Sequence, residues 1–201
     1  MITTIGIFLF PEIEVLDFAG PYEVFTTASR VAGRQSPGSE PVFSVFSVSA
    51  ACEPVRARAG LRIVPDFTFA GHPHIDLLVI PGGDVTWELE KSEVCRWIRA
   101  TAASSALTAS VCTGVFLLAR AGVVSTHRVT THWEDIAGLR ALFPGLQVVG
   151  DVRWVDEGTI VTSAGISAGI DMSLHLVERL AGRDLAVATA RQMDFDWRQG
   201  D

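Results

Sequence analysis

The feature that most constrains the fold is a set of short segments with almost no polar positions. The clearest is DLLVIP at residues 76–81, and residues 2–10 and 107–111 are of the same kind. A strand buried on both faces has this pattern, because neither of its faces needs polar side chains. Strands of that kind occur in parallel sheets that helices cover on both sides. The sequence therefore predicts an α/β fold.

Helical segments alternate with these strands along the chain. We expect strands at 2–10, 42–48, 76–81, 107–111, 147–155 and 159–162, a weak hairpin at 52–64 and a short strand at 129–131. Helices are expected at 22–31, 88–103, 113–121, 134–142, 167–180 and 185–193, with Pro21 in the first turn of the first helix. The alternation predicts a three-layer α/β sandwich with a mostly parallel sheet. Ligands of such sheets bind at the carboxyl ends of the strands.

Composition narrows the class of protein. The 201 residues fit a single domain, 1–201, and 48% hydrophobic against 19% charged residues excludes intrinsic disorder. A net charge of −7 without a basic run disfavours nucleic-acid binding. Apolar runs are far shorter than the roughly 20 residues that span a bilayer, and the N-terminus lacks the features of a signal peptide. Three cysteines without CxxC spacing suit a reducing compartment, so we expect a cytoplasmic protein.

Cys112 is the strongest candidate for a catalytic residue. It follows the strand at 107–111 directly and precedes a helix that is apolar all round. A cysteine on such a turn lies at a helix N-terminus, where backbone N–H groups favour the thiolate and are expected to lower its pKa. The N–H of Thr113 would face developing negative charge. Cys52 and Cys95 lie at no such junction and are interpreted as packing residues.

A second turn of this type occurs at Gly165-Ile-Ser167-Ala-Gly169, which matches G-x-S-x-G. A serine hydrolase needs a histidine later in the chain, and the histidine that follows Ser167 is His175 on the same predicted helix. From there it cannot reach the hydroxyl, so the triad fails. Ser167 is better explained as a polar residue that lines the site.

Asp17 lies in Leu16-Asp-Phe-Ala-Gly-Pro21, between the first strand and the first helix. It is either an N-cap or, if the sheet brings it beside Cys112, an acid–base group with a raised pKa. Both readings stay open, and Glu12 and Glu14 are alternatives for the same role.

Further candidates close other strands. Gly82 and Gly83 let backbone N–H groups approach a ligand, although they could form a simple turn. His132, in Thr130-Thr-His-Trp133, is either a base for Cys112 or a structural histidine. His72-Pro-His74 lacks a third ligand, so we expect no metal site, and no nucleotide-binding glycine motif is present.

Taken together, these motifs resemble the ThiJ/PfpI superfamily. The resemblance rests on residues 16–21, Ile80-Pro-Gly-Gly83, Ser110-Val-Cys-Thr-Gly114, Thr131-His-Trp133 and residues 164–171, which follow one another in the expected order. It implies a flavodoxin-like fold of the class I glutamine amidotransferase type and a homodimer. The pairing of Asp17 with Cys112-Thr113 is similar to the isocyanide hydratase branch. Peptidase-like members carry histidine after the cysteine, and glyoxalase-like members use a glutamate where Asp17 stands.

The resemblance implies cofactor-free hydration of an isocyanide to an N-substituted formamide. Cys112 would attack the terminal carbon and form a thioimidate, and Asp17 would shuttle the proton and activate water. Gly83 and Thr113 would orient the reacting atoms, and Ile166 and Ser167 would line the pocket. The alternative is a ligand- or redox-sensing domain like the sensor half of AraC-type regulators. No helix-turn-helix segment follows in this sequence, which disfavours a regulator.

Overall fold

The computed structural model describes residues 2–199, which form a seven-stranded sheet in the order β10-β11-β7-β6-β1-β2-β5. Its strands are β1 (Thr3–Phe8), β2 (Phe43–Ser49), β5 (Phe67–Thr68), β6 (Leu77–Ile80), β7 (Leu107–Val111), β10 (Trp154–Asp156) and β11 (Ile160–Ser163). Neighbours pair in parallel except β10, which is antiparallel to β11. The predicted mostly parallel sheet is confirmed.

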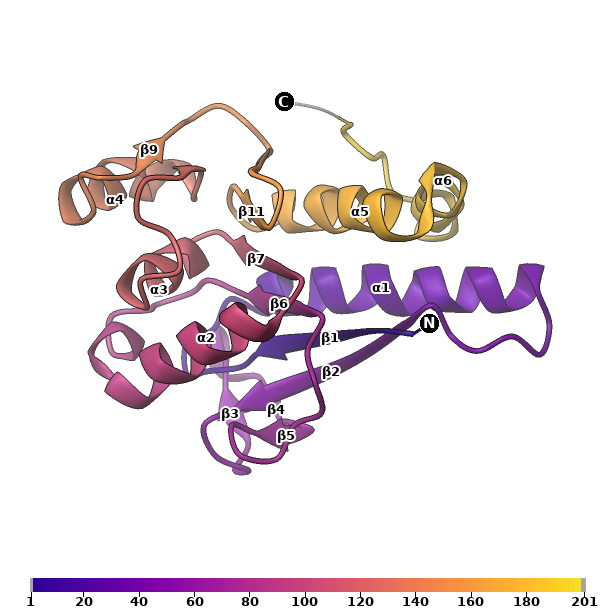
Figure 1. Cartoon of the computed structure of the whole chain (residues 1–201), viewed down its shortest axis with the longest axis horizontal. Coiled ribbons are helices and arrows are strands. Elements are labelled where there is room, and N and C mark those ends of the chain that lie inside the picture. The colour runs from indigo at the N-terminus through magenta and orange to yellow at the C-terminus, as the bar shows by residue number, and fades with distance from the viewer. Residues whose placement is uncertain (1, 200–201) are drawn as a thin grey trace.

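Helices cover both faces of this sheet. They are α1 (Val15–Gln35), α2 (Ser92–Ser104), α3 (Gly114–Arg120), α4 (Ile136–Leu142), α5 (Ala168–Ala181) and α6 (Arg183–Gln192). The helices α1, α5 and α6 pack together on one side, and α2 packs beside α3 on the other (Figure 1). The predicted three-layer sandwich is confirmed. No helix within residues 2–199 has the length and apolar character needed to cross a membrane.

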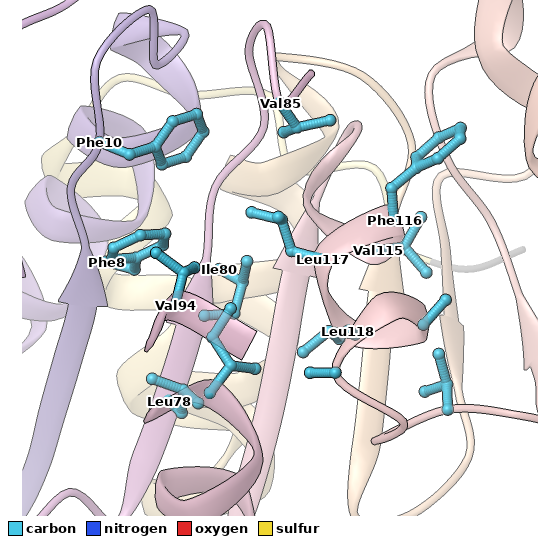
Figure 2. Packing of buried hydrophobic residues seen from close by; sticks show 14 of the residues in the cluster. Phe8, Phe10, Leu78, Ile80, Val85, Val94, Val115, Phe116, Leu117 and Leu118 are labelled. Carbon is cyan, nitrogen blue, oxygen red and sulfur yellow. The ribbon is translucent and has the colours of Figure 1, made fainter. Parts of the chain in front are cut away.

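Alternate residues of the strands feed two separate cores. In β6, Leu78 and Ile80 belong to the core beneath α2 and α3, where they lie near Val94 and Leu117 (Figure 2). The neighbours of Leu78 in β6, Leu77 and Val79, belong to the core beneath α1, α5 and α6. All four β6 residues are fully buried, which explains the uninterrupted apolar run.

Two small sheets lie outside the main one. The hairpin of β3 (Val55–Arg56) and β4 (Arg62–Ile63) encloses a short 3₁₀ turn at Arg58–Gly60, in the region where a weak hairpin is predicted. The strand β8 (Arg128–Val129) pairs in parallel with β9 (Gln147–Val148). The single strand expected at 147–155 is therefore wrong. Residues 147–148 belong to the small sheet and residues 154–156 to the edge of the large one.

The first helix also differs from expectation. It begins at Val15 instead of Tyr22, so Pro21 lies inside it. Because proline has no N–H, Pro21 cannot donate to the carbonyl of Asp17 one turn earlier, yet the helix continues to Gln35. Glu14 is the N-cap residue, and Asp17 lies in the first turn. This early start places the Asp17 side chain at the carboxyl ends of the strands.

Candidate active site

A pocket of about 290 Å³ opens at the carboxyl ends of the central strands. The residues that line it follow β1, β6, β7 and β11, together with the β3–β4 hairpin and the segment after β8. They are Glu14, Arg58, Gly83, Asp84, Cys112, Thr113, His132, Glu134, Asp135 and Ile166. The sheet thus brings together residues that lie far apart in the sequence, at the edge where ligands of parallel sheets bind.

Cys112 occupies the turn between β7 and α3 with a φ of 57°. This left-handed conformation is rare and strained for a residue with a side chain. Two hydrogen bonds to the Cys112 backbone hold this conformation. The Cys112 N–H donates to the Ser163 carbonyl at 3.2 Å, and the Cys112 carbonyl accepts from the Thr131 hydroxyl at 2.9 Å. Gly114 follows so close to the Ile80 carbonyl that no Cβ would fit. The predicted strand-to-helix turn is therefore present and tightly fixed.

The pKa of the Cys112 thiol contradicts the sequence-based expectation. Burial, followed by the negative charge of Asp17, raises this pKa to about 12. The backbone N–H groups of Thr113 and Ile166 face the sulfur and lower the pKa, but by less. The expectation of a lowered pKa was wrong because it considered only the backbone N–H groups at the helix N-terminus. Burial of the thiol and the negative charge of Asp17 both raise the pKa, and their effect is larger. Cys112 rests as a thiol.

Asp17 is fully buried, and burial raises its pKa to about 7. One carboxyl oxygen, Oδ2, accepts a hydrogen bond from the Gly82 N–H at 3.0 Å. The other, Oδ1, is buried without a partner that meets hydrogen-bond geometry, although the nearby Cys112 thiol lowers the pKa of Asp17 slightly. A buried, unpartnered carboxyl oxygen is costly and is typical of a functional group. Of the two readings of Asp17, the structure favours the acid–base group, since the N-cap is Glu14.

The two glycines after β6, Gly82 and Gly83, form hydrogen bonds with Asp17 and Thr113, whereas they were expected to face a ligand. The Gly82 N–H is used by Asp17, and the Gly83 N–H donates to the Thr113 hydroxyl at 2.9 Å. The same hydroxyl donates to the Gly83 carbonyl at 2.9 Å. A Cβ on Gly82 would lie 2.6 Å from the Thr113 nitrogen and 2.9 Å from Asp17 Oδ2. The expected role of Gly83 and the Thr113 hydroxyl in orienting substrate is thus corrected, because these groups already bind each other.

His132 and Ile166 line the pocket as predicted, and Ser167 does not. His132 Nδ1 lies 3.6 Å from Asp135 Oδ2 and 3.7 Å from Glu134 Oε2. Ser167 is exposed and lies beside Arg153, whose Nη2 is 3.4 Å from its hydroxyl. It follows Ile166, which has a φ of 50°.

Several residues of the pocket were not singled out from the sequence. Arg58 comes from the weakly predicted hairpin, and its Nη1 lies 3.4 Å from Glu14 Oε2. Glu134 and Asp135 follow His132 and add negative charge. The only sequence signal for Glu134 and Asp135 is that they come directly after the motif that contains His132. Of the other cysteines, Cys95 is half-buried in α2, but Cys52 is exposed and is not a packing residue.

Within the part of the chain that the structure describes, no group of three or more His, Cys, Asp or Glu side chains is arranged to hold a metal ion. The chemistry available to the pocket's own residues is that of a thiol, a buried carboxyl group and two backbone N–H groups that face the sulfur. This set is suited to nucleophilic attack coupled to proton transfer.

Comparison with known proteins identifies the family of this chain. The DJ-1/PfpI family matches residues 3–179, and the chain belongs to this family. It is 34% identical over 198 residues to an isonitrile hydratase of Pseudomonas putida, which covers 97% of this chain and 79% of that protein. Isonitrile is a synonym of isocyanide.

Regulators are also related. The chain is 28% identical over 193 residues to the HTH-type transcriptional regulator GbdR of Pseudomonas aeruginosa, which covers 96% of this chain but only 51% of the regulator. Among solved structures, a THiJ/PfpI family protein from Pseudomonas syringae superimposes with a TM-score of 0.85 at 27% identity, covering 98% of this chain and 76% of that one. The family therefore includes both an enzyme and regulators among relatives of this chain.

Proposed function

We propose that this protein hydrates an isocyanide to an N-substituted formamide, with Cys112 as nucleophile and Asp17 as the acid–base group. The observation that carries the proposal is that the buried Asp17 carboxyl group and the Cys112 thiol lie beside each other, so that each acts on the pKa of the other. The similarity to an isonitrile hydratase over 97% of the chain supports the choice of substrate class.

In the first step, the sulfur of Cys112 attacks the terminal carbon of R–N≡C. The thiol proton passes to Asp17 and from there to the substrate carbon, which leaves a thioimidate, R–N=CH–S. The pKa values of about 12 for Cys112 and about 7 for Asp17 set the cost of forming a thiolate in this way. The difference between the two pKa values corresponds to about 7 kcal/mol. The cost is at most this large, because Asp17 becomes neutral when it takes the proton and then no longer repels the thiolate. That cost lies well within the roughly 16 kcal/mol barrier of an enzyme that turns over ten times per second.

In the second step, Asp17 accepts a proton from water as the water oxygen adds to the thioimidate carbon, and it passes this proton to the nitrogen, which gives the adduct R–NH–CH(OH)–S–Cys112. As the carbon–sulfur bond breaks, Asp17 accepts the hydroxyl proton and returns it to the Cys112 sulfur, and R–NH–CHO leaves. Water and isocyanide are the only reactants, so no oxidant or cofactor enters the balance. The N–H groups of Thr113 and Ile166, which face the sulfur, favour negative charge there during attack and departure.

The alternative is a ligand- or redox-sensing domain, which the 28% identity to a regulator supports. A redox sensor and a hydratase both act through the thiolate of Cys112, so the pKa of this thiol does not decide between them. The 34% identity to the hydratase, of which the alignment covers 79%, favours the enzyme over the regulator, of which it covers 51%. Ligand sensing without chemistry leaves the strained turn at Cys112 and the unpartnered Asp17 oxygen without a purpose. The hydratase is therefore the better supported function. Homodimer formation stays a prediction, which analytical ultracentrifugation tests.

The test is formamide production from methyl and cyclohexyl isocyanide, followed by NMR. We expect turnover by the wild type and by Cys95→Ala, and none by Cys112→Ala. Cys95→Ala is the matched control because it removes a half-buried thiol elsewhere in the fold. Absence of turnover in the wild type, with Cys112 still alkylated by iodoacetamide, would contradict the proposal and favour the sensor.

A further inference from the structure

A second pocket, of about 260 Å³, adjoins the active-site pocket. We call it the side pocket. Three segments form its walls, namely residues 130–133 with Ile136, residues 150–153, and residues 164–166. Two of its residues, His132 and Ile166, also line the pocket that contains Cys112. His132 and Ile166 therefore lie where the two pockets adjoin, and a ligand at Cys112 lies next to the side pocket.

The side pocket differs from the active-site pocket in chemistry. Five apolar side chains line it, those of Trp133, Ile136, Val152, Ala164 and Ile166, together with one exposed carboxylate, that of Asp151. The active-site pocket has only one of these, Ile166, and carries four carboxylates. A substituent without charge is therefore better matched to the side pocket than to the active-site pocket.

The cation at the edge of the side pocket is already neutralised. The Arg153 guanidinium donates to the carboxylate of Asp171, which is fully buried, with an Nε to Oδ2 distance of 2.8 Å. A buried carboxylate holds such a partner strongly, because separating the pair would leave a buried charge without compensation. Arg153 thus shapes the wall of the side pocket without offering a free charge to an anionic ligand.

Hydrogen bonds between the three segments form the side pocket before any ligand arrives. The Ala164 N–H donates to the Arg153 carbonyl at 2.9 Å. Thr130 joins the other two segments, since its N–H donates to Thr162 Oγ1 and its hydroxyl donates to the Val149 carbonyl, both at 2.9 Å. A preformed apolar space binds an apolar group without the cost of first ordering its walls.

We infer that the side pocket receives the substituent R of the substrate, and that R is an uncharged alkyl or aryl group up to the size of one six-membered ring. The identity of the substrate as an isocyanide rests on the proposed function. An apolar cavity of about 150 Å³ holds benzene in another protein, so 260 Å³ has room for one ring. With the isocyanide carbon at Cys112, R passes between His132 and Ile166.

The test compares kcat/KM for cyclohexyl and methyl isocyanide. Each buried methylene contributes a factor of about four, so a ring that is only partly enclosed is expected to raise kcat/KM by at least about tenfold. Val152→Phe fills the side pocket, so we expect equal kcat/KM values for cyclohexyl and methyl isocyanide. Ile136→Ala widens the pocket and is expected to shift the preference to bulkier rings. Val187→Phe, on the exposed side of α6, is the matched control and should keep the wild-type ratio.

A second measurement separates this inference from the proposed function. The rate of Cys112 alkylation is compared for iodoacetamide and 2-iodo-N-cyclohexylacetamide, with the modified peptide quantified by mass spectrometry. We expect the cyclohexyl reagent to be favoured at least about tenfold in the wild type and not in Val152→Phe. If no isocyanide is hydrated, the proposed function fails, and this ratio still decides the inference. Equal ratios in the wild type, Val152→Phe and Val187→Phe would overturn it.

Discussion

The hydroxyl of Thr113 forms two hydrogen bonds with the backbone of Gly83, accepting from its N–H and donating to its carbonyl, each at 2.9 Å. Thr113 follows Cys112, and Gly83 follows the glycine that donates to Asp17. One side chain therefore fixes the loop that holds the acid–base candidate relative to the turn that holds Cys112. The separation of these two groups depends on this connection.

Replacing Thr113 by valine is expected to remove both bonds while keeping the shape of the side chain. It leaves the Gly83 N–H and carbonyl without partners, and we expect the free energy of unfolding to fall by about 2 kcal/mol. Turnover should fall at least tenfold, because Asp17 and Cys112 lose their fixed separation. Thr113→Ser keeps the hydroxyl and should retain most of both properties. Urea denaturation and formamide assays measure the effects, and a valine variant that is as stable and active as the serine variant would contradict this role.

Asp17→Asn is expected to separate reactivity of the thiol from turnover. Turnover should fall by about 10² to 10⁴, since the carboxyl group that moves the proton is lost. Alkylation of Cys112 by iodoacetamide at pH 8 should become faster, because the charge of Asp17 raises the pKa of the thiol and the variant lacks that charge. Peptide mass spectrometry measures the alkylation. Slower alkylation together with lost turnover would indicate instead that the variant disturbs the turn at Cys112.

The sheet could be predicted from the sequence because burial on both faces leaves a continuous apolar run. Residues 77–80 of β6 and residues 107–111 of β7 are all buried, and both segments were predicted as buried strands. The start of α1 could not be predicted, because Pro21 in a first turn and Pro21 inside a helix produce the same local sequence. The division of residues 147–156 between two sheets could not be predicted either, because it depends on strand pairing: β9 pairs with β8, and β10 pairs with β11.

The site was predictable only in part, for a related reason. Cys112 could be located because a strand followed by an all-apolar helix marks the turn at which it lies. The direction of a backbone N–H is not encoded in the residue type, so the glycines after β6 were predicted to face a ligand, whereas they bind Asp17 and Thr113. Arg58 reaches the pocket through tertiary packing of a weak hairpin, and nothing in its local sequence indicates this.

The acidic pocket is expected to discriminate against anionic reagents. Glu14, Asp84, Glu134 and Asp135 line the same pocket as Cys112, and Arg58 is the one arginine or lysine among the residues that line it. One uncompensated charge about 8 Å away costs an anion about 2 kcal/mol at an effective dielectric constant of 20, which corresponds to roughly thirtyfold.

We therefore expect the rate ratio of iodoacetamide to iodoacetate to be at least about tenfold higher at Cys112 than at the exposed Cys52 of the same chain. The difference should shrink in Glu134→Gln and in high salt, which screens exposed charges. Peptide mass spectrometry at both cysteines gives the ratio and its internal control together. Equal ratios at the two cysteines would show that the carboxylates do not act on the pocket.

The raised pKa of Asp17 predicts a dependence of stability on pH. A carboxyl group with an ordinary pKa of 3.8 and a folded-state pKa of about 7 binds its proton more tightly in the folded protein. Its contribution to stability is complete below about pH 4 and is lost as the pH rises to about 7, because the buried group must then ionise. Between pH 5 and pH 8, the wild type should lose about 3 kcal/mol relative to Asp17→Asn.

Asp76→Asn provides the control for this prediction. Hydrogen bonds from Thr4, with the nearby His74, outweigh desolvation and lower the pKa of Asp76, so its contribution is complete above about pH 4 and is lost only at lower pH. The stability difference between the wild type and Asp76→Asn should therefore change far less from pH 5 to pH 8 than the difference between the wild type and Asp17→Asn. Urea denaturation at each pH measures both differences. Parallel curves for the two variants would mean that Asp17 ionises with an ordinary pKa, and its role in moving the thiol proton near neutral pH would lose its physical basis.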